Sequence, residues 1–362
     1  MQNRDTEIKR DRIRAFLREK DLDGVLLTRQ DSFAWYTGGG QNHVAVATEG
    51  GAAALLATAE KDYLIANNIE AVRIMPEEGL ADLGVEMVDF PWAAPAEVTM
   101  QRAQEIAGRV ESDTGDIAGD LKRLRYSLTE YEVQRYREAG RDSAEALAET
   151  CRAIEPGQTE WQIAGMISDS LYQRALIPMV VLVAVDERIS QYRHPIPTSK
   201  VMDKSAMVVI CAKRGGLIVS TTRLVHFGPL SGELRKKHDA VMKVDATFIA
   251  GSQVGADVRG IFQTALNAYA STGFADEWTL HHQGGGTGYA TRDFKGTHDS
   301  TETVLPMQAY AWNPSITGTK SEDTIIATPD GPEIISLIED WPMVDISTDG
   351  HPSVKRADIL VR

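Results

Sequence analysis

The sequence has few cysteines, a deficit of basic residues and no long apolar run. Cys151 and Cys211 are its two cysteines, too few for a disulfide framework or a multi-thiolate zinc site, so we expect a reducing compartment. Lysine and arginine number 38 against 52 acidic residues, and a surface of that sign repels nucleic-acid phosphates and anionic lipids. Apolar runs such as 179–185 fall far short of the ~20 residues that cross a bilayer. Neither a nucleic-acid nor a membrane partner is expected.

The chain has an ordinary globular composition. It has 362 residues, of which 43% are hydrophobic and 25% charged, and this length suits two domains with buried cores. Its first 20 residues are charged throughout and contain neither an apolar signal core nor an acid-free amphipathic pattern. This pattern favours a cytoplasmic protein.

Helical and strand patterns alternate in the first third of the chain. Helical spacing of apolar residues predicts helices over 6–20 and 99–110, and short apolar runs at 25–27, 51–57 and 61–66 predict strands. Such alternation is typical of a small α/β domain. The polar stretch 112–119 marks a boundary, so we predict domains 1–118 and 119–362.

The second domain begins with helices and continues with short strands. A capping box at Ser127 and Glu130 predicts a long helix that stops before Pro156, and Thr159 caps a second helix to about residue 176. Apolar runs separated by turns then predict strands at 179–185, 206–212, 216–220, 309–312 and 324–328. Helix pairs covering a curved antiparallel sheet, an α+β arrangement, satisfy this pattern.

Short motifs follow one another along nearly the whole chain, at 23–28, 35–38, 125–132, 154–160, 194–198, 222–223, 284–288 and 321–326. In this order they resemble the motifs of the pita-bread family (peptidase family M24), which includes creatinase, aminopeptidase P and prolidase. The resemblance implies an α/β N-terminal domain followed by a pita-bread catalytic domain. It also implies a homodimer, with Arg29, Asp31 and Trp35 in a loop region that reaches the partner's cleft.

The family's metal ligands are largely missing. The resemblance implies two divalent ions held by two aspartates, a histidine and two glutamates, where this chain has in turn Cys211, Ser220 or Thr222, Gly285, Asn313 and Glu322. One carboxylate cannot neutralise two dications, so we predict that the dinuclear centre is absent and that no cofactor is bound.

A single-metal site is the alternative at the same place. It would use His281 or His282 with Glu322 and Cys211. Neighbouring residues on a strand point to opposite faces, so at most one of the two histidines is expected to face the cleft.

Creatinase, the member of this family that works without metal, matches this chain at His194, which the resemblance makes the general acid/base. Imidazole suits that role because its pKa lies near working pH; the ordinary alternative is a loop histidine satisfied by hydrogen bonds. Glu322 is expected to anchor a cationic or N–H-rich substrate, or to form a salt bridge with Arg223 or Lys320.

Several further residues are candidates for substrate binding. Asn313 could orient substrate or steady an oxyanion, or be structural. Arg292 could bind a carboxylate, or pair with Asp293. Cys211 could be a nucleophile beside His194, or a core residue. The full substrate-binding set is Asn313, Arg292, His281, His282, Arg223 and Cys211.

The leading hypothesis is a metal-independent, creatinase-like hydrolase that cleaves a C–N bond of a small nitrogenous molecule. One alternative is a metal-dependent Xaa-Pro aminopeptidase or prolidase, and another is a non-catalytic binding module of the same fold. The sequence does not distinguish hydrolysis from elimination.

Overall fold

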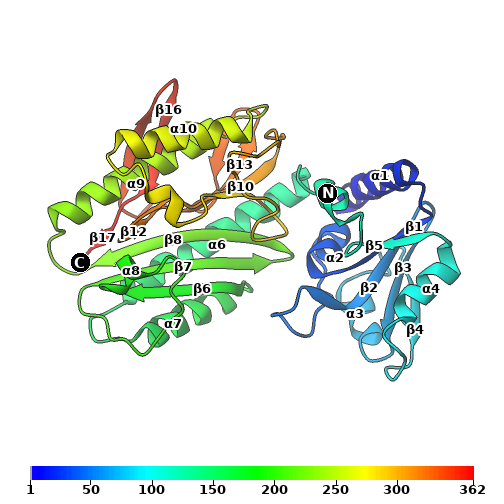
Figure 1. The fold of residues 1–362 in the computed structure, drawn as a ribbon. Helices are drawn as coiled ribbons and strands as arrows, with labels where there is room; N and C mark the ends of the chain where they lie inside the picture. Colours follow the sequence, from blue (N-terminus) through cyan, green and yellow to red (C-terminus); the bar gives the residue numbers. More distant parts are fainter. Residues whose placement is uncertain (1) are drawn as a thin grey trace. The chain divides into compact units, whose positions relative to one another are not determined.

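The computed structural model describes residues 2–362 and divides into two compact units (Figure 1). The first unit comprises the described residues up to Glu132 together with Gly215–Leu217, and the second comprises Val133–Arg214 and Ile218–Arg362. Within residues 2–362, no helix is both long enough and apolar enough to span a membrane.

The first unit is an α/β domain around one five-stranded sheet, as the sequence predicts. The sheet has the order β4-β3-β2-β1-β5, with antiparallel β1–β2 and β2–β3 pairs and parallel β1–β5 and β3–β4 pairs. The elements are α1 (Gln2–Lys20), β1 (Gly24–Arg29), α2 (Gln30–Thr37), β2 (Gly50–Thr58), β3 (Asp62–Asn67), α3 (Ala71–Glu77), β4 (Glu86–Phe90), α4 (Val98–Ala107), β5 (Val110–Ser112) and α5 (Ala118–Arg123).

Two local predictions need correction. The helix expected over 99–110 ends at Ala107, because Gly108 adopts φ +87°, and Val110 already belongs to β5. The capping box of α6 (Glu130–Ala153) is formed by Thr129, not Ser127. The Glu132 N–H donates to Thr129 Oγ1 (3.2 Å), and the Thr129 N–H donates to the Glu132 carboxylate (2.8 Å), which is the reciprocal pattern of a capping box.

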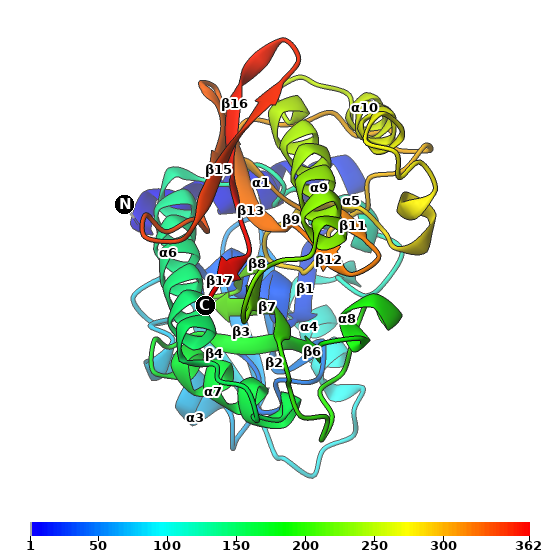
Figure 2. The ribbon, with the colours of Figure 1, turned by 90° about the vertical axis from the view of Figure 1, so that its left-hand side faces the viewer.

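The second unit is the predicted α+β domain, in which helices pack on mainly antiparallel sheets (Figure 2). One sheet has the order β14-β13-β10-β9 and another β17-β8-β7-β6. Besides α6, its elements are α7 (Glu160–Tyr172), β6 (Ile177–Val185), α8 (Arg188–Gln191), β7 (Ser205–Arg214), β8 (Leu217–His226), α9 (Gly232–Gly251), α10 (Val258–Ser271), η1 (Glu277–Leu280), β9 (Gly284–Thr287), β10 (Gln308–Trp312), β11 (Ser315–Ile316), β12 (Thr319–Lys320), β13 (Asp323–Thr328), β14 (Gly331–Ile334), β15 (Met343–Thr348), β16 (His351–Ala357) and β17 (Leu360–Val361).

Aromatic side chains join α9 to the β9–β10–β13 sheet. Phe248 of α9 stacks on Trp312 of β10 with ring centroids 4.5 Å apart, and Trp312 stacks on Tyr310 at 5.5 Å. The Trp312 indole N–H donates to Ser252 Oγ (2.9 Å), so this buried ring has its polar atom satisfied. The strands that lead to the candidate site are thereby held on a rigid core.

Candidate active site

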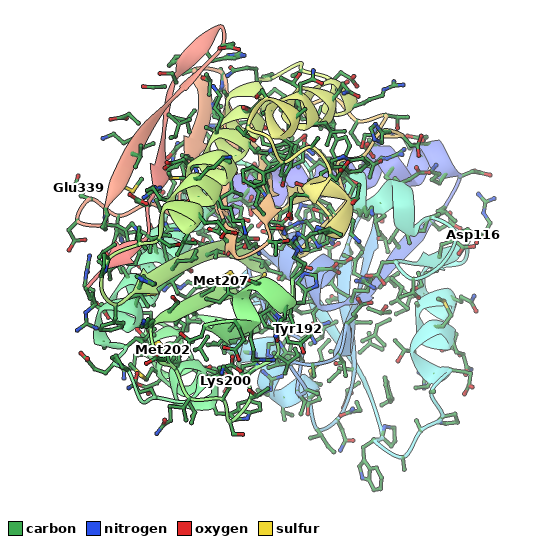
Figure 3. All side chains as sticks on the ribbon, turned by 60° about the vertical axis from the view of Figure 1, so that its left-hand side comes forward. Asp116, Tyr192, Lys200, Met202, Met207 and Glu339 are labelled. Carbon is green, nitrogen blue, oxygen red and sulfur yellow. The ribbon has the colours of Figure 1, made fainter. Side chains whose placement is uncertain are left out.

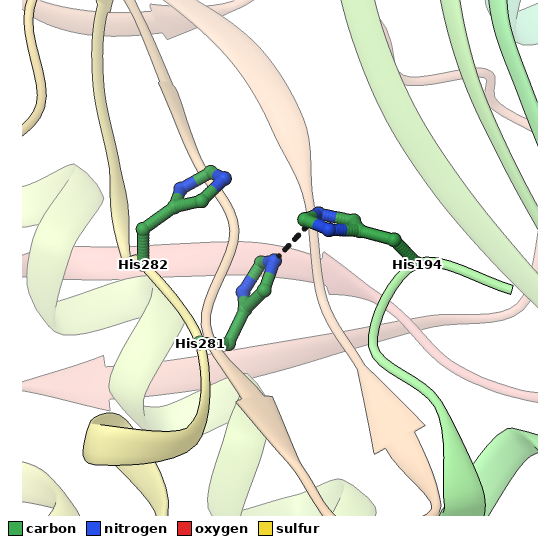
Figure 4. A group of neighbouring side chains, drawn as sticks. All are labelled: His194, His281 and His282. Carbon is green, nitrogen blue, oxygen red and sulfur yellow. Dashed lines mark hydrogen bonds between the residues drawn. The ribbon is translucent and has the colours of Figure 1, made fainter.

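Three histidines meet in the second unit (Figure 4). His194 lies in the segment that follows α8, two residues after the Tyr192 labelled in Figure 3, whereas His281 and His282 lie between η1 and β9. The Nε2 atoms of His194 and His281 are 3.0 Å apart, a hydrogen-bond distance. One ring nitrogen from each histidine lies within 4.8 Å of the other two. The three imidazoles therefore share one site.

The expectation that at most one of the two consecutive histidines faces the cleft is wrong. The His281 and His282 rings stack at 4.4 Å with an interplanar angle of 27°, and their centroids lie 4.8 and 5.8 Å from that of His194. Neither residue belongs to a strand, since η1 ends at Leu280 and β9 begins at Gly284. The alternation of side chains in a pleated strand therefore does not apply to them.

An ion pair ties the two histidine-bearing segments together. Arg193, beside His194, donates to the carboxylate of Glu277 in η1 (2.6 Å) and to Thr317 Oγ1 (2.9 Å). Glu277 also accepts from the Thr317 backbone N–H (2.9 Å). Because η1 leads directly into His281, these contacts fix the approach of His281 to His194.

A glutamine fixes the histidine segment from its other end. Gln283 accepts from the Tyr269 hydroxyl (2.8 Å) and donates to the carbonyl oxygens of Trp278 (3.1 Å) and His281 (2.6 Å). Gln283 is 1% exposed, so its amide is fully used inside the protein. This residue escaped the sequence analysis because nothing in a glutamine signals which backbone groups it will bind.

The pKa values of all three imidazoles are lowered, which favours their neutral form near pH 7. Burial lowers the pKa of His281 to about 2 and that of His282 to about 4, with further lowering by Lys320 and Arg292 respectively. Burial and the Lys320 charge also lower the pKa of His194. A neutral imidazole can accept a proton or bind a metal ion through its lone pair.

Glu322, the candidate substrate anchor, is already paired with two cations. Its carboxylate lies 2.8 Å from Lys320 Nζ and 3.3 Å from Arg292, and it accepts from the Thr222 hydroxyl (2.7 Å). Burial alone would raise the pKa of Glu322, but the Lys320 and Arg292 charges bring it below the usual value. Of the two salt-bridge partners that the sequence suggested, Lys320 is the one in contact.

Arg223 belongs to a separate buried network behind Glu322. It is 3% exposed, and its guanidinium donates to Asp323 (3.0 Å) and to the Ser336 carbonyl (2.9 Å). Arg356, which is fully buried, pairs with Asp323 (2.8 Å) and Asp245 (2.5 Å). Sequence reasoning missed this network, because apolar periodicity does not mark buried charges on facing strands and helices.

Cys211 lies in a setting that opposes thiolate formation. Its Sγ is 3.3 Å from Ser220 Oγ, and burial raises the pKa of the thiol. A nucleophilic cysteine needs the opposite shift. The core reading of Cys211 therefore fits its surroundings better than the nucleophile reading.

Three buried polar atoms at the predicted site residues have no hydrogen-bond partner among the described residues. They are Asn313 Oδ1, Arg292 Nε and His281 Nδ1. Such atoms are uncommon in native interiors, and a bound water, ion or ligand is one way to satisfy them. Asn313 is 3% exposed, so its acceptor is available to a bound group and not to bulk solvent.

The resemblance places the family's ligand positions at Cys211, Ser220 or Thr222, Gly285, Asn313 and Glu322, and this set does not fit a pair of divalent ions. Glu322 is the one carboxylate among them and is neutralised by Lys320 and Arg292. At Gly285, where the resemblance places the family's histidine, φ is +153° and a Cβ would lie 2.2 Å from the Phe294 carbonyl oxygen. No side chain can occupy that position on this backbone.

Comparison with known families assigns the fold. The model of "Metallopeptidase family M24" matches residues 134–329, which is more than half of the chain. The chain belongs to metallopeptidase family M24. The model of "Creatinase/Prolidase N-terminal domain" matches residues 9–184, so this M24 member carries both parts of the pita-bread arrangement that its motifs predict.

This M24 member has relatives at 16–21% sequence identity. An "uncharacterized peptidase" of Staphylococcus haemolyticus is 21% identical over 231 residues, which cover 61% of this chain and 66% of that protein. The "Xaa-Pro dipeptidase from Bacillus anthracis" superposes with a TM-score of 0.75 at 18% identity over 99% of this chain and 100% of that one. The "Dipeptidase PepE from Mycobacterium ulcerans" gives 0.77 at 16% identity over 100% and 99%. These solved structures support the fold alone.

Proposed function

We propose that this M24 member hydrolyses a C–N bond of a small nitrogenous substrate without the dinuclear metal centre, and that His194 is its general acid/base. The hydrogen bond between His194 and His281 carries the proposal. In a pair of neutral imidazoles joined through Nε2, one ring donates and the other accepts. His194 is exposed whereas His281 is 9% exposed, so His194 is the ring that solvent and substrate can reach.

The proton steps follow from this pair. His194, neutral near pH 7 because its pKa is lowered, takes a proton from the attacking water and returns it to the leaving nitrogen. His281 fixes the ring orientation of His194 through the shared hydrogen bond. His281 is in turn fixed by the Arg193–Glu277 pair and by Gln283, so the acid/base is positioned before substrate binds.

Substrate recognition is assigned to the partly satisfied polar groups beside the imidazoles. Arg292 keeps an unpartnered Nε and Asn313 an unpartnered Oδ1, which suit an acceptor and an N–H donor of the substrate. Glu322 contributes by holding Lys320 and Arg292 in place. Arg223 and Cys211 support the site from behind, because both are buried among other partners.

A second candidate is a metal-dependent Xaa-Pro peptidase, and family membership favours it. M24 is a metallopeptidase family, and two of the proteins with the same fold are dipeptidases. On this alternative a peptide is cleaved only when metal is supplied. Glu322 would then have to exchange Lys320 for a metal ion.

The test compares purified enzyme with and without chelator on small amides, amidines, guanidino compounds and Xaa-Pro dipeptides. We expect turnover that survives chelation and is lost in His194→Ala, whereas His351→Ala, which changes an exposed histidine of β16, retains activity. Circular dichroism checks the fold of each variant. Cleavage of Xaa-Pro dipeptides that chelator abolishes and Mn²⁺ or Co²⁺ restores would establish the second candidate. Absence of turnover on every substrate class, with and without metal, would favour a non-catalytic binding module.

A further inference from the structure

The three-histidine cluster has the composition of a metal site. None of its histidines lies at a position that the resemblance gives as an M24 metal ligand. Zinc is bound by imidazole nitrogens at about 2.0–2.1 Å, which places two tetrahedral ligand atoms about 3.3 Å apart. The His194 and His281 Nε2 atoms are 3.0 Å apart, and the three donor nitrogens lie within 4.8 Å of one another. Small ring rotations would bring all three to one ion.

The surroundings leave the cluster open to an ion. His281 Nε2 contacts His194 Nε2, and His281 Nδ1 has no partner among the described residues, so an ion on His281 displaces only the contact with His194. His194 is exposed, which provides an entry path from solvent. Three protein ligands leave a fourth tetrahedral position for water, as in open zinc sites.

We propose that His194, His281 and His282 together bind one divalent transition-metal ion of the zinc class. All three donors are neutral nitrogens, which suit Zn²⁺, Co²⁺, Ni²⁺ and Cu²⁺, whereas Mg²⁺, Ca²⁺ and Mn²⁺ prefer oxygen. The site uses none of the five positions of the family's dinuclear centre.

Charges around the cluster set its affinity. Lys320 and Arg292 act on these imidazoles, as do Lys295 and Arg193, and all four cations oppose a dication. Glu322 offsets Lys320 and Arg292, and Glu277 offsets Arg193. Replacing Lys320 by methionine removes a repulsive charge and leaves Glu322 paired with Arg292 alone, so Lys320→Met should tighten metal binding.

Metal binding has a consequence that rests on the proposed function. A metal ion on His194 occupies the lone pair that a general base needs, so one bound zinc ion should inhibit the enzyme. Chelator should then restore activity.

The test uses the metal alone. Chelator-treated protein is titrated with Zn²⁺ by calorimetry and with Co²⁺ by visible absorption, where tetrahedral coordination gives intense d–d bands. We expect one ion per chain. Loss of one ligand should cost at least as much as loss of an outer-shell partner, so His281→Ala and His282→Ala should each lower affinity by roughly 100-fold or more. His351→Ala should leave it unchanged.

If an alanine variant does not fold, His282→Asn tests the same ligand with a smaller change in volume. Absence of Co²⁺ and Zn²⁺ binding, or binding unaffected by His281→Ala and His282→Asn, overturns the proposal. If zinc bound at these histidines activates the enzyme, the proposal of metal-independent catalysis is wrong and the proposed metal site is supported. The failure of the site and the failure of the proposed function are thus separate results.

Discussion

Glu322→Gln should destabilise the second unit strongly, because it removes the anion shared by the buried Lys320 and the partly buried Arg292. The side chains of Glu322 and Lys320 are 2% and 5% exposed, and that of Arg292 is 12% exposed. The substitution keeps the shape of Glu322 and removes its charge. Lys320 would then be almost fully buried without a counter-charge.

The magnitude follows from the two distances. At an effective dielectric constant of about 20, unit charges 2.8 and 3.3 Å apart attract by about 6 and 5 kcal/mol. Desolvation of the ions offsets much of this attraction, and removal of one partner of a buried pair costs about 3–5 kcal/mol net. At about 2–4 °C per kcal/mol for a domain of this size, Tm should fall by roughly 6–20 °C.

The assay is thermal and urea unfolding of four proteins: wild type, Glu322→Gln, Lys320→Met and the double variant. If the pair is buried as described, the double variant should be more stable than Glu322→Gln, because it leaves neither Glu322 nor Lys320 as an unpaired charge. A Tm change below about 2 °C in Glu322→Gln, or strict additivity of the two single changes, would refute the reasoning.

Two further predictions concern proton transfer and backbone geometry. Because burial and Lys320 lower the pKa of His194, kcat/KM should be at its plateau at pH 7 and fall about tenfold per pH unit on the acid side, with a midpoint below the ordinary ~6.5. Lys320→Met should raise that midpoint. A wild-type midpoint above pH 7 would contradict the assignment of His194 as general base. Gly285→Ala should cost at least about 2 kcal/mol of unfolding free energy, because its Cβ would lie 2.2 Å from the Phe294 carbonyl oxygen. The control Gly228→Ala, also at positive φ but in open space, should cost only about 1–2 kcal/mol. Equal losses of unfolding free energy in chemical denaturation would argue against the close contact at Gly285.

Periodic and ordered features were predictable from the sequence. The apolar runs at 51–57 and 206–212 lie in β2 and β7, as predicted, and the order of the motifs indicated family M24. The helix cap was predicted at the wrong residue, because two neighbouring residues carry the same capping pattern. Ser127 and Thr129 both precede a glutamate by three residues, and the capping bonds form at Thr129 because α6 begins at Glu130.

The composition of the site was predictable, whereas its arrangement was not. His194 and Glu322 could be named because they lie in motifs, but the pairing of Glu322 with Lys320 depends on how β12 leads into β13. The orientation of His281 and His282 was predicted from strand geometry and failed, since a 3₁₀ turn precedes them. The alternation of side chains in a strand mispredicts the direction of residues that lie before the strand begins, as His281 and His282 do before β9.

Lys320 and Arg292 neutralise the buried Glu322 carboxylate, and this affects where a metal ion can bind. A buried carboxylate needs a positive partner, and in a dinuclear centre metal ions supply it. Here Lys320 and Arg292 supply it, and the same two cations help to keep the neighbouring imidazoles unprotonated. Metal binding at Glu322 would have to displace a charge-assisted contact of 2.8 Å, whereas metal binding at the three histidines displaces two neutral hydrogen bonds, His194–His281 and the one that the Gly284 N–H donates to His282 Nδ1 (3.3 Å). A divalent ion added to this protein should therefore bind the histidines before it binds Glu322.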